Sequence, residues 1–156
     1  MKRRVFSHGV LAGLITSQTL SWGQTKPQLV IEVWKTATCG CCTSWVSHLK
    51  VKGFDVKTHN ISDSEKSSLR RRLGLVDSFA SCHTGLVGGY LIEGHVGAQD
   101  IKRLLDEKPK ALGLAAPGMP VGSPGMDDPA YAGRQDKYAV LLVQRDGSSS
   151  IFKQYP

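Results

Sequence analysis

The chain has 156 residues, of which 40% are hydrophobic and 21% are charged, as is ordinary for one globular domain. The formal net charge of +7 falls to +4 once the three charges of a basic leader are removed. Further basic residues, such as Arg70-Arg71-Arg72, stand among acids and serines without interleaved aromatics. This pattern is typical of a solvated helix face, so we exclude nucleic acid as a partner.

Residues 1–23 have the pattern of a cleaved export signal, with a basic start, a weakly apolar stretch to Leu20 and small residues in Ser21-Trp22-Gly23. Polar residues interrupt the stretch, which therefore falls short of the about 20 apolar residues of a membrane span. Arg3-Arg4-Val5-Phe6 is also similar to a twin-arginine signal, and the general secretory route stays open. We expect a single mature domain over 24–156, periplasmic or otherwise exported, with no stable membrane span.

The first half of this domain has the pattern of two strand-helix pairs. The short β-branched run over 29–34 predicts a buried strand, and apolar spacing over 43–52 predicts a helix that ends at Gly53. A second strand is expected over 54–61. A second helix follows from Ser62 or Asp63 to Leu73, with a capping box at its start.

The second half is predicted to begin with a connecting turn over 75–80 and two short antiparallel strands within 84–96. A helix over 99–107 follows, and Pro109 ends it. Residues 111–133 are rich in glycine, proline and alanine and contain two methionines, which predicts a long irregular loop. The last segments, 138–144 and 150–155, indicate a β-hairpin that extends the sheet.

The order strand, helix, strand, helix, strand, strand, helix is the order of the thioredoxin fold, and its parallel start satisfies the right-handed crossover rule. The sequence therefore predicts an α/β, thioredoxin-like fold with a long Gly/Pro/Met loop and an added C-terminal β-hairpin.

All four cysteines lie in the expected mature domain, and three of them crowd into Cys39-Gly40-Cys41-Cys42 between the first strand and the first helix. A disulfide framework is usually spread along a small secreted chain, so this crowding indicates another use. At a helix N-terminus the unpaired N–H groups and the helix dipole favour the thiolate. The cluster therefore suits redox exchange or metal ligation.

Cys82 lies where a thioredoxin-like chain enters its third strand, against the N-terminus of the first helix. Thioredoxins have a cis-proline there, whereas this chain has Ser81-Cys82-His83-Thr84. We expect the four sulfurs and the His83 imidazole to converge, with His48, His59 and His95 in mainly structural roles. His95 follows the predicted hairpin and is the one of these three that can also approach the site.

Thiolates and thioethers favour copper(I), although zinc and iron-sulfur centres also accept sulfur-rich sites. Adjacent Cys41 and Cys42 do not easily wrap one tetrahedral ion together with Cys39, so we expect thiolates that bridge several copper(I) ions. Met119 and Met126 become further ligands if their loop folds back over the cluster, and packing is the alternative role for both.

Several motifs together carry a family resemblance from Leu29 to the C-terminus: the cysteine cluster followed by Trp45, Ser81-Cys82-His83-Thr84, Glu93-Gly94-His95-Val96, and the glycine- and proline-rich stretch over 113–126. The chain resembles the periplasmic copper-resistance proteins of the CopG type, long catalogued as a domain of unknown function. The resemblance implies a thioredoxin-like fold, a cysteine-bridged copper cluster with neighbouring histidine, and a role in copper homeostasis. Gly97 departs from the proline that family members often have there.

Other functions stay open beside copper(I) binding. The Cys39–Cys42 pair would serve a thiol-disulfide oxidoreductase that attacks through Cys39, although the cis-proline of thioredoxins is missing. A zinc or iron-sulfur protein is the third alternative. We expect no ordinary enzymatic catalysis, copper ions as the cargo, and other periplasmic copper-handling proteins as partners.

Overall fold

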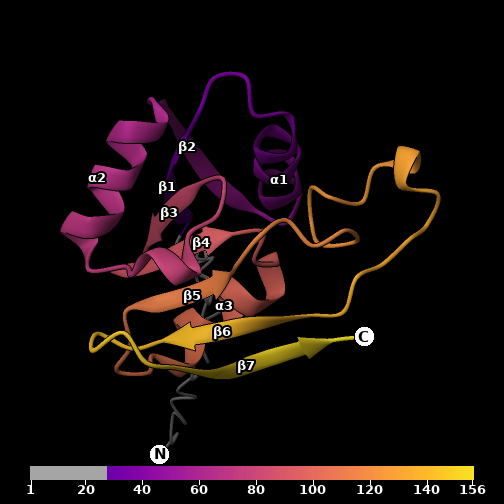
Figure 1. Cartoon of the computed structure of the whole chain (residues 1–156). Helices are drawn as coiled ribbons and strands as arrows, with labels where there is room; N and C mark the ends of the chain where they lie inside the picture. The colour runs from indigo at the N-terminus through magenta and orange to yellow at the C-terminus, as the bar shows by residue number, and fades with distance from the viewer. Residues whose placement is uncertain (1–27) are drawn as a thin grey trace, which may run out of the picture.

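The computed structural model describes residues 28–156, in which three α-helices pack on one mixed seven-stranded sheet of order β2-β1-β3-β4-β5-β6-β7 (Figure 1). The strands are β1 (Leu29–Lys35), β2 (Phe54–Asn60), β3 (Thr84–Val87), β4 (Tyr90–Gly94), β5 (Gly113–Ala116), β6 (Tyr138–Val143) and β7 (Ser149–Tyr155). The helices are α1 (Gly40–Val51), α2 (Asp63–Leu73) and α3 (Ala98–Glu107), with 3-10 turns η1 (Asp77–Phe79) and η2 (Pro129–Tyr131). The mixed α/β prediction is confirmed, and the predicted signal over 1–23 lies outside the described residues.

The strands and α-helices from β1 to α3 follow the predicted order. β1 and β2 are parallel, whereas β3 is antiparallel to both β1 and β4. Ser62 and Glu65 form the predicted capping box of α2, and Gly74 ends that helix in the left-handed region at φ 83°. In the part of the chain that the structure describes, no helix has both the length and the apolar character that crossing a membrane requires.

Helix α1 begins at Gly40, three residues before the predicted start. Its N-cap is Cys39, whose sulfur accepts a hydrogen bond from the Cys42 backbone N–H at 3.3 Å. A thiol is not among the usual N-cap groups, which explains why the sequence pattern placed the start too late. Cys41 and Cys42 therefore lie in the first helical turn.

The predicted irregular loop over 111–133 is corrected at its start, where β5 forms. This strand is parallel to β4 and antiparallel to β6, so it joins the C-terminal hairpin to the rest of the sheet. The pairing depends on Gly113, because a Cβ at this position would lie 1.8 Å from the Leu91 carbonyl oxygen. The irregular loop therefore runs from 117 to 137, and η2 is its one helical turn.

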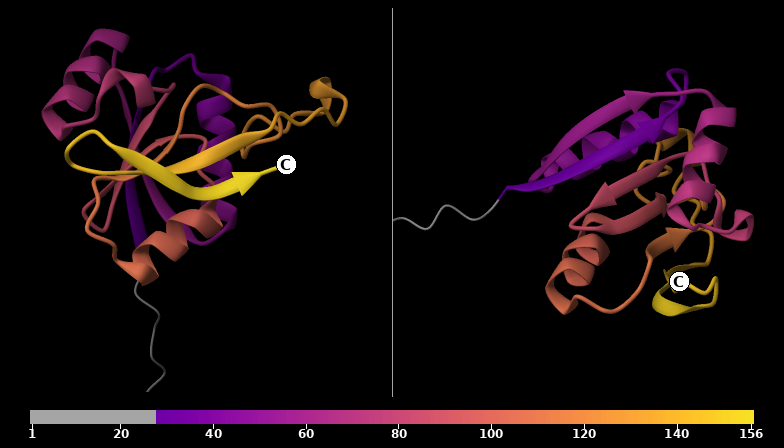
Figure 2. Two further views of the ribbon diagram at one scale, coloured as in Figure 1. Left: turned by 60° about the horizontal axis from the view of Figure 1, so that its bottom comes forward. Right: turned by 90° about the vertical axis from the view of Figure 1, so that its left-hand side faces the viewer.

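Hydrophobic side chains fill both faces of the sheet. One cluster includes Trp45 and Leu49 from α1 and Ile101 and Leu104 from α3, and all four are fully buried. A smaller cluster on the other face includes Leu91 and Ala115, with Leu73 at the end of α2 packed against it. Figure 2 shows this layering, with α2 on the opposite side of the sheet from α1 and α3.

Candidate metal centre

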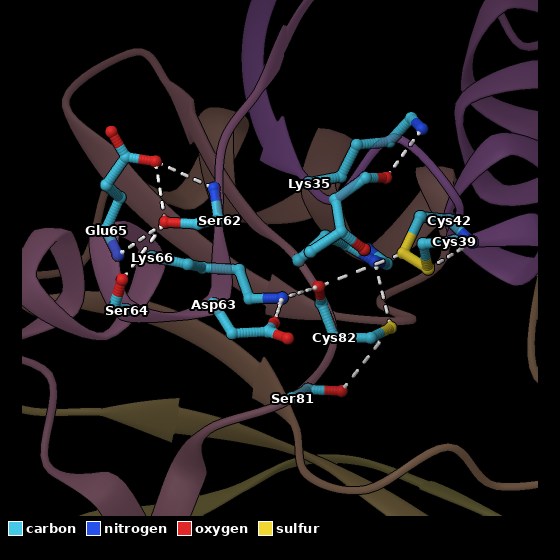
Figure 3. Close-up of polar contacts among 12 residues, drawn as sticks. Lys35, Cys39, Cys42, Ser62, Asp63, Ser64, Glu65, Lys66, Ser81 and Cys82 are labelled. Carbon is cyan, nitrogen blue, oxygen red and sulfur yellow. Dashed lines mark hydrogen bonds and ion pairs between the residues drawn. A yellow bond between two sulfur atoms is a disulfide. The ribbon is translucent and has the colours of Figure 1, made fainter.

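Four cysteine sulfurs meet at the N-terminus of α1. The Sγ atoms of Cys39, Cys41, Cys42 and Cys82 all lie within 4.8 Å of one another. Cys39 and Cys42 form a disulfide (Figure 3), whereas Cys41 and Cys82 are free thiols. Cys41 Sγ lies 3.5 Å from Cys39 Sγ and 4.0 Å from Cys82 Sγ. The fold therefore brings the downstream cysteine to the three upstream ones, as the topology predicted.

Two histidines also lie next to the sulfur of Cys82. Cys82 Sγ lies 3.2 Å from His83 Nδ1 and 3.1 Å from His95 Nε2, and the ligand atoms of the three residues lie within 4.8 Å of one another. Cys82 thus belongs both to a group of four sulfurs and to a group of one sulfur and two imidazoles.

His95 contacts Cys82 although the sequence pattern indicated a mainly structural role. The antiparallel pairing of β3 with β4 sets Thr84 opposite Glu93. His83 precedes β3 and His95 follows β4, so both histidines come to the same end of this hairpin. The register of the predicted hairpin was the signal that could have found His95.

The tautomer of His95 leaves one nitrogen free for a metal ion. Its Nδ1 lies 2.9 Å from the Pro124 carbonyl oxygen, which only accepts, so Nδ1 donates and the Nε2 lone pair faces Cys82. Burial lowers the pKa of His95, and burial together with His95 lowers the pKa of His83 well below its usual range. Both rings are therefore neutral near pH 7, which is the protonation state that binds metals.

His83 is enclosed by other rings. Its side chain is fully buried, with its ring centroid 4.2 Å from that of Trp45 and 5.0 Å from that of His95. Among residues 28–156, its Nε2 atom has no hydrogen-bond partner. The Trp45 indole N–H donates to the Val96 carbonyl at 2.8 Å, which fixes the surface on which His83 packs.

Cys82 keeps its proton when no cation is present. Burial, followed by the nearby Cys41 thiol, raises the pKa of Cys82 to about 12. The sulfur becomes a thiolate ligand only when a positive ion replaces the proton. Metal uptake at this sulfur would therefore release a proton.

The two methionines of the loop have different surroundings. Met119 Sδ lies 4.0 Å from Cys41 Sγ, and 53% of the Met119 side chain is exposed at the surface of the cluster. Ser81 Oγ donates to the carbonyl of Gly118 and ties this part of the loop to the segment that carries Cys82. Met126 is buried, and its sulfur accepts a hydrogen bond from Tyr131 at 3.9 Å, which is a packing contact.

The loop between β5 and β6 also lies against α1, as Figure 1 shows. Gly125 has a φ of 85°, and a Cβ there would lie 2.7 Å from the backbone nitrogen of Trp45 and 2.8 Å from the Cys41 carbonyl oxygen. Only glycine allows both this backbone conformation and this approach. The loop is therefore held close to the helix turn that contains Cys41 and Cys42.

Two solved structures and one family model are similar to this chain. Two solved structures described as "Copper resistance protein copG", form 2 and form 1, are each 45% identical to this chain, with TM-scores of 0.76 and 0.75. Each alignment covers 83% of this chain and 99% or 98% of the solved one. Residues 79–126 match the family model described as "Protein of unknown function, DUF411". A search of curated proteins finds no match.

The range that matches the family model includes Cys82, His83 and His95, which form the group of one sulfur and two imidazoles. The two solved structures are similar to most of this chain. The described residues of this chain form one seven-stranded sheet and three α-helices. The sequence identity and the coverage together show that this chain belongs to the CopG family of copper-resistance proteins.

Proposed function

We propose that this protein is an exported copper(I)-binding protein of copper homeostasis, and that it holds several copper ions in a thiolate-bridged cluster. One observation carries the proposal: the sulfur of Cys82 belongs to two groups of metal-binding atoms at once. A thiolate with two sets of neighbours is suited to bridge ions. Both solved relatives are named for copper resistance, which agrees with copper as the cargo.

The donor atoms support copper(I) in particular. Four cysteine sulfurs and the Met119 thioether make a soft group, and His83 and His95 add two imidazoles next to Cys82. Thioethers favour copper(I), whereas zinc and iron-sulfur centres use thiolate and imidazole. The exposed Met119 is the ligand that an incoming ion meets first.

The redox state of the Cys39–Cys42 pair sets how many thiolates the cluster can offer. As a disulfide, the pair withdraws two of the four sulfurs from thiolate ligation. Two electrons and two protons from a dithiol reductant cleave the S–S bond and give two thiols. We infer that the reduced protein carries copper and that the disulfide belongs to the metal-free protein.

The thioredoxin-like assignment and the export are part of the same proposal. The sheet order β2-β1-β3-β4 and the Cys-x-x-Cys pair at the start of α1 support that fold. The disulfide suits an oxidising compartment such as the periplasm, where other copper-handling proteins would exchange copper with this one. The signal over 1–23 would direct the export by the secretory or the twin-arginine route.

An anaerobic titration of the reduced mature protein with copper(I), in competition with a chelator, tests the proposal. We expect more than one ion per chain, and Cys82→Ser should lower both the affinity and the number of ions because it removes the shared sulfur. Met119→Leu should weaken binding, whereas Met126→Leu is the matched control and should not. Less than one ion per chain, or unchanged binding in Cys82→Ser, would refute the copper assignment.

A second function is favoured by the Cys39–Cys42 disulfide itself, which lies where thioredoxins have their reactive pair. In this alternative the protein exchanges disulfides with other proteins. Insulin reduction by the metal-free protein at a rate near that of a thioredoxin would favour it over copper binding. Elemental analysis of the freshly purified protein separates both from a zinc or iron-sulfur protein.

A further inference from the structure

Helix α2 sends two long cationic side chains to the segment that carries Cys82. Lys66 and Arg70 are only 5% and 6% exposed, and they are four residues apart, so they lie on the same face of the helix. Lysine and arginine are seldom buried unless they are paired. Neither side chain has a role in the proposed copper chemistry, so their burial calls for another reason.

Both cations donate to neighbouring backbone carbonyls. Lys66 Nζ donates to the Cys82 carbonyl oxygen at 2.8 Å and to Asp63 Oδ1 at 2.9 Å, as Figure 3 shows. Arg70 Nη2 donates to the Ser81 carbonyl oxygen. Two successive peptide groups beside the cluster are therefore held by one face of α2.

Glu93 of β4 holds the same segment from the other direction. Its carboxylate is fully buried; Oε1 accepts from the Ser81 backbone N–H at 2.7 Å and lies 2.8 Å from Arg70 Nε. Its Oε2 accepts from Thr84 Oγ1 at 2.6 Å. Hydrogen bonds to charged groups are the stronger ones in proteins, so residues 81–84 are restrained on both sides.

We propose that Lys66, Arg70 and Glu93 are positioning residues for the copper site, which we call the Cys82 clamp. They fix the backbone of Ser81 and Cys82 so that the Cys82 sulfur lies close to both Cys41 and the two histidines. The clamp rests on the proposed function for its purpose. Its effect on the Cys82 sulfur can nevertheless be measured with no metal present.

The metal-free test uses a Cys39→Ser/Cys42→Ser background, which leaves Cys41 and Cys82 as the two remaining thiols; their sulfurs lie 4.0 Å apart in the structure of the unmodified chain. In a glutathione buffer the two thiols form a disulfide while oxidised glutathione is reduced to two molecules of glutathione. The equilibrium gives the effective concentration of one thiol at the other, which depends on how well the fold positions them.

In this background Lys66→Met should lower the effective concentration about tenfold, because one charged hydrogen bond to the Cys82 carbonyl is lost. Lys66→Arg keeps the charge and the donors and should restore most of it. Arg72→Met is the matched control, since it removes a positive charge from a less buried position of the same helix and should change nothing. Circular dichroism checks that each variant folds.

Should Lys66→Met not fold, Lys66→Gln replaces it, because glutamine is polar but uncharged and one bond too short for the same contact. The same tenfold loss is expected. An unchanged effective concentration in the folded Lys66 variant would overturn the clamp, and so would an equal loss in Arg72→Met.

A copper(I) titration of Lys66→Met with all four cysteines present completes the test, and we expect an affinity about tenfold lower than that of the unmodified protein. If the unmodified protein binds no copper(I) but Lys66→Met lowers the effective concentration, the clamp stands and the copper function fails. If the unmodified protein binds copper(I) and Lys66→Met changes neither quantity, the clamp fails and the copper function stands.

Discussion

The thiol of Cys82 is close to two kinds of donor, with Cys41 Sγ 4.0 Å away and imidazole nitrogens at 3.1 and 3.2 Å. Its pKa is raised to about 12, chiefly by burial, so an arriving ion competes with a proton for this sulfur. Copper(I) binding at this residue, as proposed, should therefore weaken as the pH falls. Because the pKa values of both histidines are lowered, the imidazoles compete with protons only at a lower pH.

His95→Gln tests whether imidazole takes part. If His95 Nε2 is a ligand, the variant should lose about tenfold or more in copper(I) affinity, and X-ray absorption should show fewer nitrogen neighbours per copper. His59→Gln is the control, because His59 is exposed, stacks on Trp34 and belongs to neither group of metal-binding atoms. Scattering by sulfur alone in the unmodified protein would contradict a ligand role for His95.

The convergence of the cysteines was predictable because three of them lie within four positions and the topology alone places Cys82 beside them. The contact of His95 was not predictable in the same way. It depends on the register of β3 with β4, and a shift by one residue turns every side chain of a strand to the other face. Lys66 and Arg70 gave no signal either, since lysine and arginine in a helix usually lie at the surface.

At the level of elements, β5 is the strand that periodicity did not reveal. Its residues Gly113-Leu114-Ala115-Ala116 have neither the alternation nor the β-branched side chains of a typical strand. All four are buried, because β4 and β6 pair with β5 on both sides and the two core clusters cover its faces. Small residues suit this place, and tertiary packing outweighs their low intrinsic preference for strands.

Gly113→Ala should disrupt this part of the sheet, because the new methyl group would lie 1.8 Å from the Leu91 carbonyl oxygen. We expect a loss of about 2–4 kcal/mol in the free energy of unfolding, measured with urea. Gly40→Ala is the control, because a Cβ there meets nothing within 4 Å and the position is helical. Equal stability of the two variants would show that β4 and β5 do not pair as described.

Across the whole molecule, the candidate site is assembled from segments that are far apart in sequence. The start of α1, the residues just before β3, the end of β4 and the loop after β5 each contribute a side chain near Cys41 or Cys82. A copper ion bound by these segments would crosslink the fold. It would bind the folded chain more tightly than the unfolded chain, in which only Cys39, Cys41 and Cys42 stay near one another. Copper binding would therefore stabilise the folded protein by mass action.

Thermal unfolding measures this coupling. With free copper(I) at about 100 times the dissociation constant, each occupied site should add up to about 2.7 kcal/mol to the stability of the reduced protein, or roughly 10 °C in Tm. The oxidised protein should gain less, because its Cys39–Cys42 disulfide removes two thiolates. A copper(I) chelator should reverse the gain, and an equal shift in both redox states would contradict a role for these two sulfurs.

Trp45 gives the cluster a built-in optical reporter. Its indole ring is fully buried, and its centroid lies 4.2 Å from that of the His83 imidazole, which in turn contacts Cys82. The fluorescence of an indole is quenched by a metal ion bound beside it or by a protonated imidazole in contact with it. The intrinsic fluorescence of the chain should therefore dim as copper fills the cluster, so that loading can be followed in real time without an added dye.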